Sequence, residues 1–161
     1  MAIGISSLIF TVTALLMDYN GRSIASLANY AELDQESRYT LDLLFQEVRR
    51  ADSIEEYTAN EIVFNTGGGT TNLRYLFTPS TGLFVQFKNG ARTELLSGCT
   101  AMNITLYGRN MISNQFSQFA TTNVANAKMV QFHWRCERKV LGSMINSENV
   151  QSAKIVVRKQ N

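Results

Sequence analysis

The chain is poor in the side chains that carry out catalysis and hold metal ions. Among its 161 residues there are one histidine, two cysteines and one proline. A hydrolase requires a base beside its nucleophile, but His133 lies on the expected polar face of a strand, with no carboxylate at a suitable spacing. An exposed histidine is therefore the simpler interpretation. No lysine-bearing glycine loop, aspartate-rich loop or ligand cluster suggests a phosphate or metal site, so we expect no enzymatic activity and no cofactor.

A strong net charge is also missing. The formal charge is +2, and the lysines and arginines are scattered along the sequence instead of forming a stripe. The densest basic run, residues 134–139, mixes basic and acidic side chains, which is typical of a solvated strand face and not of a phosphate-binding surface. We expect no nucleic acid among the partners.

Charge is absent before Asp18, and residues 2–17 are almost continuously apolar. A secretory signal peptide would have a basic start and a small-residue cleavage site, and neither is evident. A buried core helix would show a polar face, but the polar side chains here are hydroxyls that can bond to their own helix. They are Ser6, Ser7, Thr11 and Thr13. We expect a membrane-inserted helix, although about sixteen residues span about 24 Å, less than the ~30 Å hydrocarbon layer.

Proline and glycine are missing from residues 23–51, where apolar and small side chains recur every three or four residues. This spacing predicts an amphipathic helix over residues 23–52. Its apolar stripe is expected to pack on the rest of the domain through Leu41, Leu44 and Val48.

The segment DYNG, residues 18–21, is the expected weak point between the two helical halves, because asparagine and glycine have low helix propensity. A helix that continues through it would be about 75 Å long. We therefore divide the chain into a membrane or filament-core half of the helix, residues 1–22, and a globular domain, residues 23–161.

Beyond residue 53 the sequence predicts β structure, because strand-like runs alternate with turns and no helical pattern separates them. Asn89-Gly90 suits a type I′ hairpin, in which both central residues need positive φ. The expected strands are 54–58, 61–66, 72–77, 82–88, 91–96, 102–107, 127–137 and 152–159, and the expected loops include 66–71, 78–82, 109–126 and 142–149. The expected fold class is α+β, a long N-terminal helix packed on a largely antiparallel sheet within residues 54–159.

The two cysteines, Cys99 and Cys136, raise a question of bonding. From Val130 to Glu137 apolar and polar side chains alternate, as in a half-buried strand, and this strand is expected to pair with residues 102–107. Cys136 then points inward, whereas Cys99 shares the parity of outward residues. A bulge between Cys99 and residue 102 would turn Cys99 inward and allow a disulfide. The sequence leaves open both a disulfide and two separately buried thiols.

The order of these features resembles a known family. An apolar helix opening MAIGISSLIFTVTALL runs into an amphipathic half ending RYTLDLLFQEVRRADSI, and an antiparallel sheet follows. This order is similar to that of type IV pilins and type II secretion pseudopilins, and most closely to their minor, J- or W-like members. The matching segments are the helix end at Leu41–Ala51, the run Leu95–Gly98 before an inner strand, and a final strand at Val156–Lys159. The resemblance covers nearly the whole chain and implies a pilin-like fold.

The resemblance departs at the N-terminus. Family members are made with a short basic leader, which a prepilin peptidase removes before a methylated aromatic residue, and they carry a glutamate early in the mature helix. None of these precedes the apolar run here. We expect that part of the mature helix precedes Met1, so that a full precursor with a leader would be a substrate of prepilin peptidase.

The resemblance implies a structural subunit that is first held in the bacterial inner membrane as a single-pass protein. Its helix would then pack among those of other pilin or pseudopilin subunits in a periplasmic or cell-surface filament, because helix contacts replace lipid contacts. A minor subunit would lie at or near the tip and prime assembly. The expected membrane and packing residues are Ile5, Leu8, Ile9, Val12, Leu15 and Leu16.

Two other classes stand as alternatives. A single-pass, membrane-anchored periplasmic binding or sensory domain that does not polymerise would have a ligand pocket and a membrane-proximal linker. An exported enzyme with an uncleaved anchor would need a convergent polar site. The unbroken helical pattern argues against the linker, and the sequence shows no such polar site.

Overall fold

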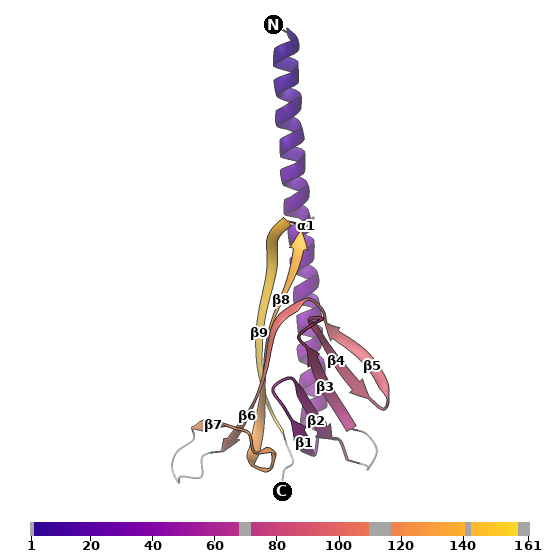
Figure 1. Ribbon diagram of the computed structural model, residues 1–161, viewed down its shortest axis with the longest axis vertical. Coiled ribbons are helices and arrows are strands. Elements are labelled where there is room, and N and C mark those ends of the chain that lie inside the picture. The colour runs from indigo at the N-terminus through magenta and orange to yellow at the C-terminus, as the bar shows by residue number, and fades with distance from the viewer. Residues whose placement is uncertain (1, 68–71, 110–116, 141–142, 158–161) are drawn as a thin grey trace.

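A computed structural model describes residues 2–67, 72–109, 117–140 and 143–157. Its dominant element is a single helix, α1 (Ala2–Arg50), which is about 74 Å long at 1.5 Å per residue. The C-terminal half of α1 lies against the β strands, and the N-terminal half projects beyond them (Figure 1). The expected α+β class, with a long helix on antiparallel strands, is confirmed.

The helix does not break at the DYNG segment, although Asn20 and Gly21 are poor helix formers. Asp18 and Arg22 form an ion pair at 2.9 Å across this segment, one helical turn apart. A pair of this spacing stabilises a helix by about 0.2–0.5 kcal/mol. The ion pair therefore offsets part of the low propensity at the expected weak point.

Five strands follow α1 and form one antiparallel sheet in chain order. They are β1 (Ser53–Tyr57), β2 (Glu61–Asn65), β3 (Asn72–Thr78), β4 (Leu83–Lys88) and β5 (Ala91–Leu96). The β4–β5 turn is the expected hairpin, with φ of 54° at Asn89 and 79° at Gly90. Of the expected loop 66–71, residues 68–71 lie outside the described residues.

The remaining strands form a second, four-stranded antiparallel sheet in the order β7-β6-β8-β9. They are β6 (Cys99–Arg109), β7 (Gln118–Thr121), β8 (Ala127–Val140) and β9 (Ser143–Val156), and a short 3-10 helix, η1 (Val124–Asn126), precedes β8. The expected pairing of residues 102–107 with 127–137 is present, with Ile104 opposite Phe132.

Several expected boundaries were wrong, and β8 runs to Val140, three residues beyond its expected end. Strand β7 lies inside the expected loop 109–126, of which residues 110–116 are outside the described part of the chain. Strand β9 begins inside the expected loop 142–149 and ends at Val156, while residues 158 and 159 of the expected last strand are not described. Strand β6 extends beyond 102–107 at both ends. The polar start of β9 pairs along β8, because backbone pairing does not require apolar side chains.

The sequence predicted one sheet, and the structure has two. The chain crosses between them at Gly98, where φ is 65° and an added Cβ would lie 2.8 Å from the Glu137 carbonyl oxygen. The Glu137 amide donates to the Gly98 carbonyl at 2.9 Å. Only glycine satisfies this backbone conformation and this close approach together.

The core lies between α1 and the two sheets. Tyr75 of the first sheet stacks on Phe84 at 5.8 Å between ring centroids, and its edge meets Phe132 of the second sheet at 6.1 Å. These rings and Trp134 are fully buried, and burial of each contributes about 1.5–3 kcal/mol. This shared core holds the C-terminal half of α1 in place.

Candidate functional site

The N-terminal half of α1 presents a large apolar surface to solvent. The six expected packing residues, Ile5, Leu8, Ile9, Val12, Leu15 and Leu16, are between 47% and 67% exposed. Their spacing of three and four places them on one side of the helix. No described strand covers this side, so the structure brings the six together on an open surface.

The apolar surface is wider than the sequence interpretation allowed. Phe10, Met17 and Ile24 follow one another at intervals of seven residues on a different side of α1 and are 78%, 70% and 68% exposed. That spacing was a visible signal and was missed. A helix that is apolar all round is typical of one buried among other helices or in lipid. Among the described residues, no helix combines the length and apolar character needed to cross a membrane.

Polar groups in this half of α1 are largely satisfied within the helix. Ser7, Thr11 and Thr13 donate to the carbonyl oxygens of Gly4, Ser7 and Ile9 at 3.0, 2.8 and 2.9 Å. A buried hydroxyl without a partner costs about 1–3 kcal/mol. These hydroxyls can therefore enter an apolar environment without losing their hydrogen bonds.

The other half of α1 is docked onto the sheets through the expected stripe. Leu44 and Val48 are fully buried, and Leu41 is half-buried and packs against the core. Leu33 extends the buried stripe by two turns towards the N-terminus and is 1% exposed. The three expected helix-to-sheet residues thus lie in or against one contiguous core cluster.

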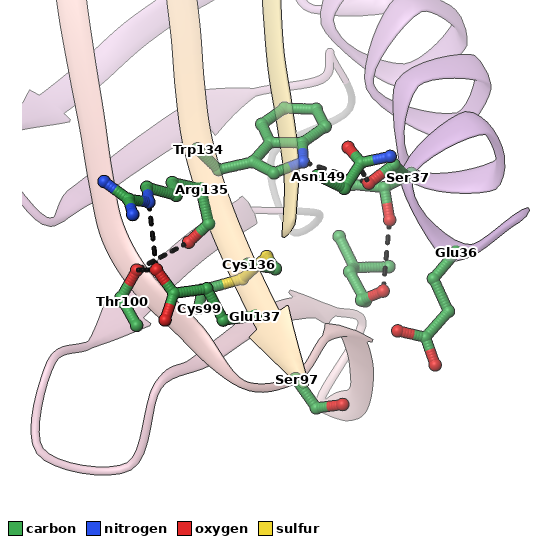
Figure 2. Close-up of a disulfide and its surroundings, with 12 residues drawn as sticks. Glu36, Ser37, Ser97, Cys99, Thr100, Trp134, Arg135, Cys136, Glu137 and Asn149 are labelled. Carbon is green, nitrogen blue, oxygen red and sulfur yellow. Dashed lines mark hydrogen bonds and ion pairs between the residues drawn. A yellow bond between two sulfur atoms is a disulfide. The ribbon is translucent and has the colours of Figure 1, made fainter. Parts of the chain in front are cut away.

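Buried hydrogen bonds join the same stripe to both sheets. The Trp134 indole donates to the Ser37 hydroxyl at 3.2 Å, and that hydroxyl donates to the side-chain oxygen of Asn149 at 3.2 Å. Figure 2 shows these three side chains meeting between α1 and the second sheet. Thr40 donates to the Leu95 carbonyl at 3.1 Å, which ties α1 to the first sheet. Ser37 fits the spacing of the stripe, four residues after Leu33 and four before Leu41, but that spacing gives no sign of these partners.

Ion pairs border the docked half. Arg138 of β8 contacts Glu36 at 2.7 Å and Glu32 at 3.4 Å, and it also donates to the Ser97 hydroxyl at 3.3 Å. On the first sheet, Lys88 pairs with Glu47 at 2.7 Å. Ion pairs that are partly exposed contribute about 0–1 kcal/mol each. Their main effect is to fix the rotation of α1 about its axis, because each pair is satisfied in only one register.

Cys99 and Cys136 form a disulfide, which resolves the alternative that the sequence left open. The two residues lie opposite each other in the β6–β8 ladder, and the register shifts between Cys99 and Ala101. That bulge turns the Cys99 side chain inward, where its exposed fraction is 3%. The disulfide closes a loop of 37 residues, and a loop of this length implies about 4 kcal/mol of stabilisation in the chain-entropy treatment.

His133 is exposed on the outer face of β8, and no cluster of three or more potential metal ligands occurs among the described residues. Burial raises the pKa of the Tyr75 phenol, with a smaller opposing effect from its hydrogen bond to Gln86. Tyr75 therefore stays protonated in the core and acts as a packing residue.

Comparison with known proteins adds no relative: no protein-family model, curated protein or solved structure matches the chain. The features that bear on function are therefore the open half of α1 and its attachment to the two sheets.

Proposed function

We propose that the chain is a structural subunit of a type IV pilus-like or type II secretion filament, a minor pilin or pseudopilin that packs by the N-terminal half of α1. The observation that carries this proposal is one unbroken helix with two contrasting halves. Residues 33–48 are built into the core, whereas residues 4–30 expose large apolar side chains on more than one side.

The exposed half calls for an apolar partner. Burying one leucine or isoleucine side chain contributes about 1.5–3 kcal/mol relative to water, and more than ten large apolar side chains of this half are exposed. Neighbouring helices of the same kind provide such an environment over about 40 Å of helix. The satisfied hydroxyls and the Asp18–Arg22 pair are compatible with it.

Inner-membrane anchoring before assembly, with the body in the periplasm, belongs to the same proposal. Lipid would cover the apolar half of α1 until other pilin or pseudopilin subunits replace it. The Cys99–Cys136 disulfide supports a location outside the cytoplasm, because disulfides persist in oxidising compartments. The body then lies beyond the helical core and faces outward.

Cysteine cross-linking in membranes of the native host tests the proposal. Both native cysteines are bonded, so Leu8→Cys and Leu15→Cys each introduce one free thiol on the open helix. The matched control is Thr93→Cys on β5, which is also exposed but lies on the body. The other pilin-family subunits in these membranes are given a cysteine at the facing helix positions. After mild oxidation we expect Leu8→Cys and Leu15→Cys to form covalent adducts with those subunits, and Thr93→Cys to form none.

The alternative is a membrane-anchored binding or sensory domain that does not polymerise. If this alternative holds, all three variants stay monomeric in the membrane fraction. The thiol of Leu8→Cys then reacts only with lipid-soluble reagents. That outcome would remove the filament from consideration.

A further inference from the structure

A pocket of about 290 Å³ lies on the second sheet, at the end where β6, β7, β8 and β9 come together. In Figure 1 this end of the sheet is the one far from the free end of α1. The volume is at the lower limit of the ~300–1,000 Å³ typical of small-molecule sites. Its lining residues are Tyr107, Gly108, Arg109, Ser117, Gln118, Lys128, Met129 and Val156.

The floor of the pocket is largely apolar, unlike the neighbouring row of the same face. Met129 of β8 lies opposite Tyr107 of β6 and Val156 of β9, so the three form one row across the sheet. The neighbouring row on the same face holds Thr105, Gln131 and Lys154. An apolar floor with a few polar groups around it is typical of pockets that bind small molecules.

The rim of the pocket is cationic. Arg109 and Lys128 belong to the lining, and none of the lining residues that the structure describes is acidic. The Lys154 ammonium lies over the Tyr107 ring, 4.5 Å from its centroid, which adds a third positive charge on one side of the floor. A guanidinium and an ammonium close together bind a carboxylate through charge-assisted hydrogen bonds.

We propose that this pocket binds a small organic anion with a flat apolar body, of the aryl carboxylate class. The ring would lie on Met129 and Val156 beside Tyr107, whose own ring carries the Lys154 ammonium on one side, and the carboxylate would meet Arg109 and Lys128. This inference goes beyond the filament proposal and does not depend on it, because the pocket is on the body and stays open when the free half of α1 is covered.

The test uses the full chain in nonionic detergent, with methionine methyl groups labelled with carbon-13 for NMR. Benzoate is the probe, and Met129→Leu assigns the Met129 signal. We expect benzoate to shift the Met129 methyl resonance and to leave that of Met102, which is partly buried against the core, unchanged. Arg109→Ala should weaken benzoate binding about tenfold, the loss typical of one charge-assisted hydrogen bond. The matched control, Arg92→Ala, removes another exposed arginine, on the other sheet, and should change nothing.

Two comparison probes complete the design, one that is neutral and one that has no ring. Benzamide keeps the ring and lacks the charge, and inorganic phosphate keeps the charge and lacks the ring. Both should bind at least tenfold more weakly than benzoate. The proposal is overturned if benzoate leaves Met129 unmoved, if Arg109→Ala and Arg92→Ala behave alike, or if either comparison probe binds as well as benzoate.

Discussion

Single side chains decide how α1 sits on the two sheets. Apolar residues such as Leu44 supply the burial, whereas Ser37 and Thr40 supply hydrogen bonds that only one placement of the helix satisfies. A smooth apolar stripe alone would tolerate rotation or sliding of the helix, because hydrophobic contact is not directional. The polar contacts thus select one placement among several of similar burial.

At this scale, Leu44→Asp should destabilise the body by several kcal/mol, because it places a charge without a partner at a fully buried position. Urea unfolding followed by tryptophan fluorescence measures the change, since Trp134 is the only tryptophan and is buried in the same core. Gln46→Asp, on the exposed side of the same helix, is the control and should lower stability by well under 1 kcal/mol. Equal unfolding midpoints for the two variants would contradict the packing described here.

At the scale of elements, α1 acts as one helix with two environments. The helix continues through Asn20 and Gly21 on the strength of interactions within the helix alone, since no described strand contacts this part of it. An added Cβ at Gly21 would meet nothing within 4 Å. The middle of α1 is therefore the place where a small change in helix propensity has a direct effect on order.

Gly21→Ala should make this segment more stable by about 1 kcal/mol, the propensity difference between glycine and alanine in a helix interior. Amide hydrogen exchange across residues 17–25 would then slow by about fivefold. Gly4→Ala, close to the helix end, also meets no neighbour but should have a smaller effect because helix ends fray. Unchanged exchange in Gly21→Ala would show that the segment is not helical in solution.

The elements that could be predicted from the sequence are those with a strong local signal. Alternation along β8 and the Asn89-Gly90 turn gave correct strands, and the three-to-four spacing gave the docked half of α1. Strand β7 and the start of β9 were missed because their polar residues lack alternation, and their pairing is set by β6 and β8 instead. The partners of Ser37 are 97 and 112 residues away along the chain, so no local pattern could reveal them.

At the scale of the whole molecule, the second sheet is tied to itself by the only disulfide in the chain. Cys99 lies immediately after the crossing at Gly98, and Cys136 lies opposite it on β8. The enclosed loop contains β6, β7, η1 and most of β8. The bond therefore restricts the unfolded chain over β6, β7 and most of β8, whereas β9 lies outside the closed loop.

Replacement of both cysteines by serine should lower the free energy of unfolding by about 4 kcal/mol, the loop-entropy value for this separation. Urea unfolding of the Cys99→Ser/Cys136→Ser variant and of the oxidised wild type measures the difference. The amide hydrogen exchange rates of the two proteins should also differ, and the difference should be smaller in the first sheet than in the second. An unchanged midpoint would mean that the crossing and its backbone contacts alone hold β6 against β8.

The way α1 lies along the β8–β9 ribbon has a mechanical consequence (Figure 1). Attachments run from Asn29, which donates to the Lys139 carbonyl at 3.5 Å, to Glu47 on Lys88, about 27 Å along the helix axis. A pull on the free end of α1 would load these attachments in shear and at the same time, not one after another as in peeling. Under tension the helix and the body therefore move as one rigid unit. A force that pulls on the free end of α1 along its axis carries the folded domain with it.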